Sequence, residues 1–219
     1  MTLESGAAIT VRDAAYERGV FINCPFDLAY RPMFDAIVFA VSVCGLTPHS
    51  ALEVDDASQT RLDRIGKLIG DCRWGVHDIS RVESNEHGLP RFNMPFELGL
   101  FFGAKRFGSP AQRRKSCLVF DTEPFRYQRF ISDISGQDIT AHGNETGRAI
   151  TLVRNWISDT LPHDGSIIPG GTEIARMFAE FQAALPGLCR QARIEADELT
   201  FLDRVRFARA WLQTVRRAE

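Results

Sequence analysis

The chain has 219 residues, with 26 Lys and Arg against 28 Asp and Glu, so its formal net charge is -2. A hydrophobic fraction of 44% and a charged fraction of 25% are typical of a globular protein that buries a core. This composition excludes a wholly disordered chain, and the balanced charge gives no sign of the basic surface that general nucleic-acid binding requires.

The cysteine pattern and the hydropathy point to a cytoplasmic protein. The five cysteines are odd in number and widely spaced, without a Cys-x-x-Cys pair or a His pair at zinc-site spacing, so no metal site is expected. Cys24, Cys44 and Cys117 lie in apolar runs and are expected as reduced core residues. The start of the chain lacks the apolar stretch of a secretory signal, and the longest apolar run, 36–46, is too short for a membrane helix. We therefore expect a soluble cytoplasmic protein with no membrane contact.

Short β-rich runs alternate with longer helical patterns over the first two thirds of the chain. In order, the patterns predict a strand at 20–24, a helix at 30–44, a strand at 47–52, a helix at 61–72, a strand at 74–79, a helix at 93–106, a strand at 117–120, a short strand near Ile139 and a helix at 146–161. This alternation predicts an α/β fold with a mostly parallel sheet.

The end of the chain has a different pattern. Residues 162–171 are the most linker-like stretch, and two further helices are predicted at 173–185 and 195–215. About 50 residues hold little independent core, so we expect a single domain over 1–219. Its α/β core would span 19–161, and 162–219 would form a helical C-terminal cap.

Polar residues follow the predicted strands, where ligands bind in an open parallel sheet. The candidate ligand-binding residues are Asn23, Phe26, Asp27, Tyr30, Arg61, Ser80, Arg91 and Asn93, and the candidate catalytic residues are Asp78 and Glu97. Structural roles compete with these functional ones. Asp27 is equally suited to cap a helix and Phe26 to pack in the core, whereas a solvent-facing position is the commoner one for an arginine such as Arg61 or Arg91.

The positions of the five histidines in the sequence favour structural roles over a catalytic or ligand-binding site. His77 lies within a predicted strand and is expected as a core or sheet-face residue. The other four are expected in loops: His49, His87, His142 and His163.

The segment from Asn93 to Gly99 carries the most specific signal. Asn93 and Glu97 are one helical turn apart and share a face. A capping interpretation is the alternative, with Asn93 as N-cap and Glu97 near the positive end of the helix dipole. The spacing of four differs from the three of a capping box. Gly99 and Gly103 are expected to let this helix pack closely on the sheet.

Residues 20–121 resemble the nucleoside 2-deoxyribosyltransferase-like and TIR-like group of bacterial proteins. The resemblance rests on Asp78-Ile79-Ser80 after the third strand and on the motif N-x-x-x-E-x-G from Asn93 to Gly99. It implies a flavodoxin-like sheet of strand order 2-1-3-4-5. It also implies that Glu97 acts at the sugar C1′ of an N-glycoside and that Asp78 handles the ribose or a proton. The Gly-Thr pair that precedes the glutamate in the transferases is absent, which leaves the substrate base open.

The resemblance implies an N-glycosidase or deoxyribosyltransferase that acts on a nucleotide, with NAD-like molecules as leading substrates, in bacterial defence against phage. Cleaving an N-glycosidic bond builds positive charge on the sugar, which a carboxylate can stabilise or capture. The alternatives are a non-catalytic nucleotide sensor that uses the same cleft and an interaction module built on the C-terminal helices. Beyond the nucleotide no cofactor is expected. The expected partners are further copies of the chain and a protein of the same defence system.

The strand order also predicts the layout of the site. Asn23, Asp78 and Glu97 would line one small-ligand pocket, because the first and third strands are neighbours. Phe26 and Tyr30 would form a wall for a flat base. Arg61 or Arg91 would lie at the mouth for a phosphate.

Overall fold

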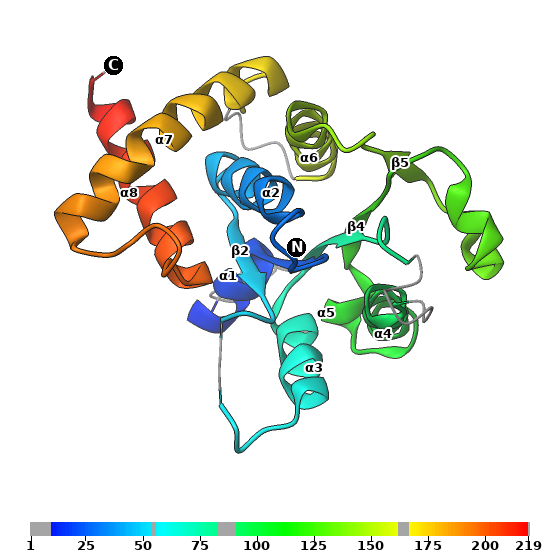
Figure 1. Cartoon of the computed structure of the whole chain (residues 1–219). Coiled ribbons are helices and arrows are strands. Elements are labelled where there is room, and N and C mark those ends of the chain that lie inside the picture. Colours follow the sequence, from blue (N-terminus) through cyan, green and yellow to red (C-terminus); the bar gives the residue numbers. More distant parts are fainter. Residues whose placement is uncertain (1–9, 54–55, 83–90, 162–166, 219) are drawn as a thin grey trace, which may run out of the picture.

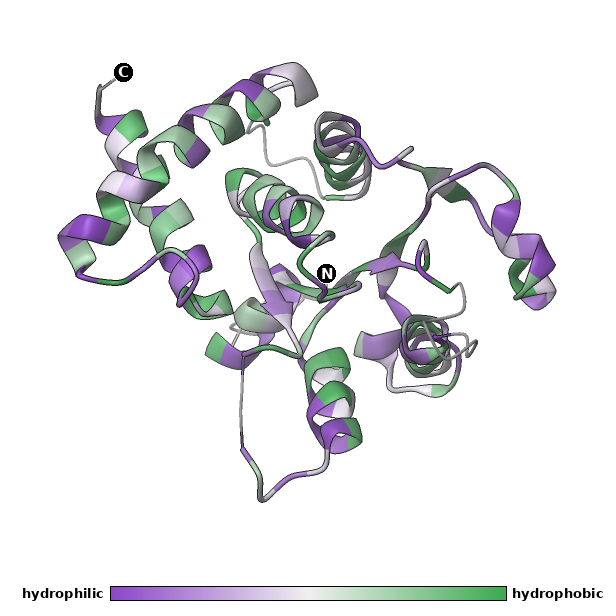
Figure 2. Cartoon of the chain, in the orientation of Figure 1, coloured by the Kyte–Doolittle hydropathy of each residue, from purple (hydrophilic) through white to green (hydrophobic). Residues whose placement is uncertain are grey.

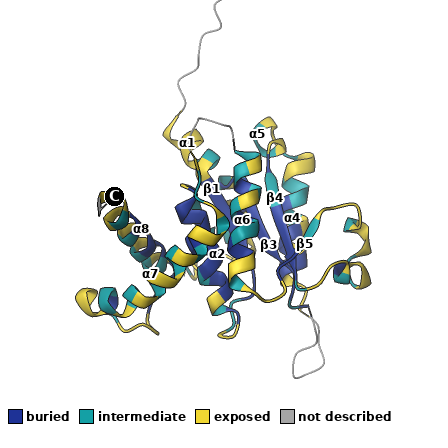
Figure 3. Cartoon of the chain, turned by 90° about the horizontal axis from the view of Figure 1, so that it is seen from above, coloured by how far each residue is buried: buried dark blue, intermediate teal, exposed yellow. Residues whose placement is uncertain are grey.

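The computed structural model describes residues 10–53, 56–82, 91–161 and 167–218. Five parallel strands form one sheet in the order β2-β1-β3-β4-β5, which confirms the predicted flavodoxin-like α/β fold (Figure 1). The strands are β1 (Gly19–Asn23), β2 (Thr47–Ser50), β3 (Trp74–Asp78), β4 (Ser116–Asp121) and β5 (Ile139–Ala141). Every residue of β1 and β3 is buried, as their apolar character requires in a sheet covered on both faces (Figure 3).

Helices cover the two faces of the sheet (Figure 1). On one face, α2 (Arg31–Val43) and α6 (Thr146–Thr160) contribute to the main hydrophobic core. On the other, α3 (Arg61–Asp71) and α4 (Asn93–Phe107) pack together over a smaller apolar cluster. Shorter elements are α5 (Pro110–Arg113) and the 3₁₀ turns η1 (Arg126–Arg129) and η2 (Ser132–Ile134). No helix in the described part of the chain has the length and hydropathy to cross a bilayer.

The last two helices, α7 (Gly171–Ala192) and α8 (Phe201–Ala218), pack against α2 and share its core. Phe39 of α2 stacks on Phe181, with ring centroids 5.2 Å apart, and its centroid lies 5.9 Å from that of Trp211. α2 therefore has apolar partners on its outer side as well as in the sheet, which explains its largely hydrophobic surface (Figure 2).

Both C-terminal helices differ from their predicted bounds. α7 does not end at residue 185 but continues through Pro186, because a proline removes only one helical hydrogen bond and the partly buried Leu188 beyond it packs against the main core. α8 begins at Phe201 rather than at 195. Thr200 caps it by accepting a hydrogen bond from the backbone N–H of Asp203 at 3.2 Å.

An N-terminal helix, α1 (Val11–Arg18), was not predicted. It has no buried residue and therefore no apolar periodicity to reveal it. Its start is marked by a capping box, in which Thr10 and Asp13 exchange side-chain to backbone hydrogen bonds.

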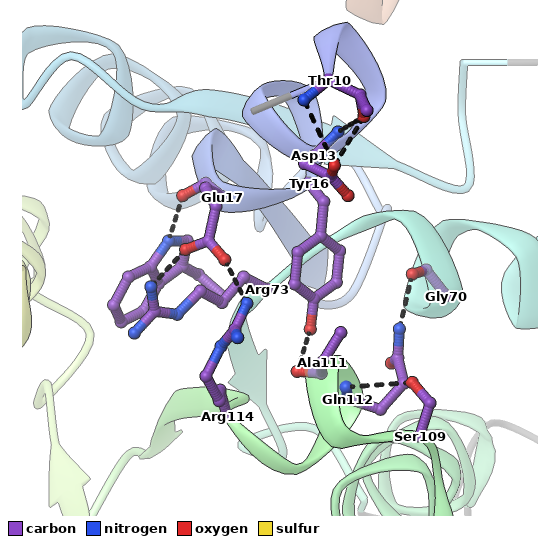
Figure 4. A network of polar contacts seen from close by, with 11 residues as sticks. Thr10, Asp13, Tyr16, Glu17, Gly70, Arg73, Ser109, Ala111, Gln112 and Arg114 are labelled. Carbon is purple, nitrogen blue, oxygen red and sulfur yellow. Dashed lines mark hydrogen bonds and ion pairs between the residues drawn. The ribbon is translucent and has the colours of Figure 1, made fainter. Parts of the chain in front are cut away.

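Polar contacts hold α1 against the edge of the sheet where the strands begin (Figure 4). Glu17 forms ion pairs with Arg73 and Arg114. The Tyr16 hydroxyl donates to the carbonyl of Ala111 at 2.8 Å. These contacts give α1 a fixed position without a hydrophobic face.

Candidate functional site

The candidate site lies at the edge of the sheet where β1 and β3 end. Asn23 is the last residue of β1, Asp78 is the last of β3, and Asn23 pairs in register with His77. The chain leaves β1 toward β2 and leaves β3 toward β4, in opposite directions along the sheet. This reversal is the switch point at which ligands bind in open parallel sheets.

Asp78 is completely buried and accepts three hydrogen bonds. Its Oδ2 accepts from the Tyr30 hydroxyl and from Nε2 of His142 at 2.9 Å, and its Oδ1 accepts from the backbone N–H of Ser80 at 2.7 Å. Nδ1 of His142 accepts from the backbone N–H of Asn144, so Nε2 carries the ring proton. Burial and the Asp78 charge raise the pKa of Tyr30 well above its usual value, so its hydroxyl keeps its proton and donates.

His142 lies in a loop, as expected, but its place beside Asp78 was not predicted. The residue directly follows β5 (Ile139–Ala141) and is completely buried against Asp78. It obeys the rule that polar residues after parallel strands converge. It was missed because β5 has only three residues and gives a weak signal.

Asn23 connects β1, β3 and α4. Its side-chain NH₂ donates to the carbonyl of Met94 in the first turn of α4, at 2.9 Å, and lies 3.1 Å from Nδ1 of His77. His77 is a buried sheet residue, as predicted, and burial lowers its pKa to about 3, so it is neutral and Nδ1 can accept. Both donors of the Asn23 amide are thus used within the protein. Its role in this structure is to hold α4 in position.

Glu97 is 4% exposed on α4 and faces Arg61 at the start of α3, with 3.8 Å between Oε1 and the guanidinium. Burial raises the pKa of Glu97 to about 7, and the positive charge of Arg61 only partly opposes this. The capping interpretation is wrong: Phe92 occupies the N-cap position, Asn93 is the first helical residue, and no side chain caps the helix. Glu97 lies one turn further along α4, so helix capping does not explain why its carboxyl group is buried.

Cys24, the residue after β1, is a buried thiol that feels the charge of the predicted carboxylates. Besides burial, the charges of Asp78, Glu97 and Asp27 raise the pKa of this thiol well above its usual value. These carboxylates come from separate segments of the chain, and each of them disfavours the thiolate form of Cys24.

The loop after β1 is arranged differently from the expectation. Tyr30 is 3% exposed and acts as a donor to Asp78, so it does not offer an open ring face to a base. Phe26 is half-buried and packs edge-on against Phe34. Asp27 accepts from the backbone N–H of Tyr30 at 3.1 Å and from Arg81 at 2.9 Å, which supports its structural role.

The other predicted binding residues differ in how far they are buried. Arg91 and Asn93 are exposed. Ser80 is buried, and its carbonyl accepts from Arg126 at 2.7 Å. Arg126, which sequence reasoning missed, also pairs with the buried Asp121 at the end of β4. Most of the loop before Arg91, residues 83–90, lies outside the described residues, as do His87 and His163.

Two glycines of α4 also depart from their predicted role. A Cβ added at Gly99 or at Gly103 would meet no atom within 4 Å, so neither residue is needed for close packing on the sheet. The helix approaches the sheet instead at Gly75 of β3. A Cβ there would lie 2.9 Å from the ring of Phe101.

The arrangement favours proton-transfer or electrostatic chemistry at one carboxyl group. Glu97 combines burial, a pKa near neutrality and a neighbouring cation, which are features of a functional acid. The described residues contain no group of three or more His, Cys, Asp or Glu side chains able to hold a metal ion. Comparison of the chain with protein-family models, with curated proteins and with solved structures found no match.

Proposed function

We propose that the chain is an N-glycosidase or 2-deoxyribosyltransferase-like enzyme that cleaves the N-glycosidic bond of a nucleotide, with an NAD-like molecule as leading substrate. The observation that carries this proposal is the buried Glu97, held beside Arg61 on the helix that follows β3. Glu97 is also the glutamate of the N-x-x-x-E-x-G motif, and the resemblance of residues 20–121 implies that this glutamate acts at the sugar C1′.

Both protonation states of Glu97 suit this reaction. As the N-glycosidic bond breaks, positive charge develops on the sugar ring, and the carboxylate form can stabilise the charge or capture C1′. The protonated form can deliver a proton to the departing base. A pKa near 7 makes both forms available at neutral pH.

The neighbouring groups have supporting roles in the proposal. Arg61 is half-exposed, so its guanidinium can contact both Glu97 and a phosphate of the substrate. Asp78 accepts hydrogen bonds from Tyr30, Ser80 and His142, and it acts by holding the loops after β1 and β5 in place. This differs from the direct role that the family resemblance implies for Asp78.

A nucleotide sensor is the second candidate, and the internal hydrogen bonds of the Asp78 carboxylate and the Asn23 NH₂ group favour it. Asn23 and Asp78 make their hydrogen bonds within the protein. Glu97 and Arg61 are therefore the charged pair proposed to contact a ligand. A sensor in antiphage defence would bind its nucleotide and pass the signal to further copies or to a partner protein. The resemblance supports such a cellular role for either candidate.

One experiment separates the two. The protein is incubated with NAD, NADP, ATP and deoxynucleosides, and the recovered ligands are analysed by mass spectrometry. Release of free base that is lost in Glu97→Gln supports the enzyme. Intact ligand bound to both proteins supports the sensor and excludes the enzyme for that panel.

A further inference from the structure

A cavity lies at the opposite edge of the sheet, where β2 begins. It has a volume of about 490 Å³, and its lining includes Arg18 at the end of α1 with Arg209 and Arg216 of α8. We call it the arginine cavity. Thr47, the first residue of β2, also lines it. The candidate site described above is at the carboxyl ends of the strands, so the two places are distinct.

Among the described residues, the lining of the arginine cavity carries positive charge only. Its lining contains no Asp or Glu, and within the described residues none of its three guanidinium groups forms an ion pair. Arg18 donates to the carbonyl of Gly45 at 2.8 Å, and Arg209 donates to the Thr47 hydroxyl at 3.0 Å. These neutral partners orient two guanidinium groups and leave other N–H donors free, since each guanidinium carries five.

Helix dipoles explain only part of this cluster. Arg18 lies in the last turn of α1 and Arg216 in the last turn of α8, where cations offset the negative end of a helix. This effect fades within one turn. Arg209 lies in the middle of α8, so the dipole of α8 gives no reason for it to face the cavity.

We propose that the arginine cavity binds the phosphate groups of a small molecule that carries several phosphoryl charges. Planar guanidinium groups from separate elements suit such a ligand, because each can donate two parallel hydrogen bonds to a phosphate. The volume lies in the range of small-molecule sites. Leu46 and Leu212 add an apolar part to the lining, which can cover an uncharged body attached to the phosphates.

The test measures binding of inorganic tripolyphosphate by isothermal titration calorimetry, with ATP and adenosine in parallel. Saturable binding of tripolyphosphate that weakens with salt is expected, with no binding of adenosine. Tighter binding of ATP than of tripolyphosphate would identify a nucleotide as the ligand, and the reverse order would identify a free polyphosphate. Arg216→Gln should reduce the affinity on the order of 10-fold, the usual effect of losing a charged hydrogen bond.

The chain offers two matched controls. Arg217 is exposed on the same turn of α8 but does not line the cavity, so Arg217→Gln removes the same charge and should leave the affinity nearly unchanged. Arg61→Gln at the candidate site should also leave it unchanged. Absence of saturable binding, equal losses in Arg216→Gln and Arg217→Gln, or a loss confined to Arg61→Gln would overturn the proposal.

Discussion

The Glu97 carboxylate lies 3.8 Å from the guanidinium of Arg61, and these two residues join the second turn of α4 to the first residue of α3. Even with this cation nearby, burial dominates and raises the pKa of Glu97 to about 7. A carboxyl group whose pKa is raised by folding makes the free energy of unfolding depend on pH.

Glu97 should make stability depend on pH in a defined window. Its pKa is higher in the folded state, about 7, than the usual value of 4.5, so the folded state binds its proton more tightly. This contribution is fully present below pH 4.5 and is lost as the pH rises to 7, by an amount on the order of 2–3 kcal/mol. Urea unfolding measured across this range gives the free energy of unfolding at each pH.

Glu97→Gln is the control for this prediction, because glutamine has nearly the same shape and no titration. The stability of wild type relative to this variant should fall between pH 4.5 and 7. If the two stability curves run parallel through that range, Glu97 does not have the raised pKa.

The bond from Tyr30 to Asp78 should be needed for stability. Tyr30→Phe removes one of three donors to a completely buried carboxylate, which should reduce the free energy of unfolding by about 1–3 kcal/mol. Tyr127→Phe is a matched control, since Tyr127 is equally buried and its hydroxyl has no hydrogen-bond partner in the described part of the chain. Equal effects of the two substitutions in urea unfolding would show that the Asp78 contact contributes little.

Gly75 should tolerate no side chain. An added Cβ would lie 2.7 Å from Nε2 of His77 and 2.9 Å from the ring of Phe101, so Gly75→Ala should cost about 1–3 kcal/mol through overpacking. Gly99→Ala, in the open face of α4, should instead be neutral or stabilise the helix by up to about 1 kcal/mol. Thermal unfolding of both variants tests the pair, and a stable Gly75→Ala protein would contradict the packing of α4 on β3.

Hydrophobic patterns predicted the central fold well, because β1 and α2 consist mostly of apolar residues. They could not predict α1, which buries no side chain, or the true start of α8. A local signal was present in both cases. A Thr and an Asp three residues later form a capping contact at three helix starts: Thr10 and Asp13, Thr60 and Asp63, Thr200 and Asp203.

The candidate site was predictable in its location and less so in the role of each side chain. The rule for parallel strands indicated the segments that hold Asn23, Asp78 and Glu97. It could not show that Asn23 and Asp78 form hydrogen bonds within the protein. Asn23 bonds to Met94, 71 residues away in the chain, and Asp78 bonds to His142, 64 residues away. Such pairings depend on the tertiary fold rather than on local spacing.

In the proposed reaction Glu97 acts on the N-glycosidic bond, so the rate of base release depends on its carboxyl group. With whichever nucleotide of the panel is cleaved, Glu97→Gln should lower the rate on the order of 10²-fold or more, as expected for loss of a group that stabilises the transition state. Glu195→Gln, which removes an exposed carboxylate between α7 and α8, should leave the rate unchanged. Base release by Glu97→Gln at the wild-type rate would show that Glu97 does not act on the N-glycosidic bond.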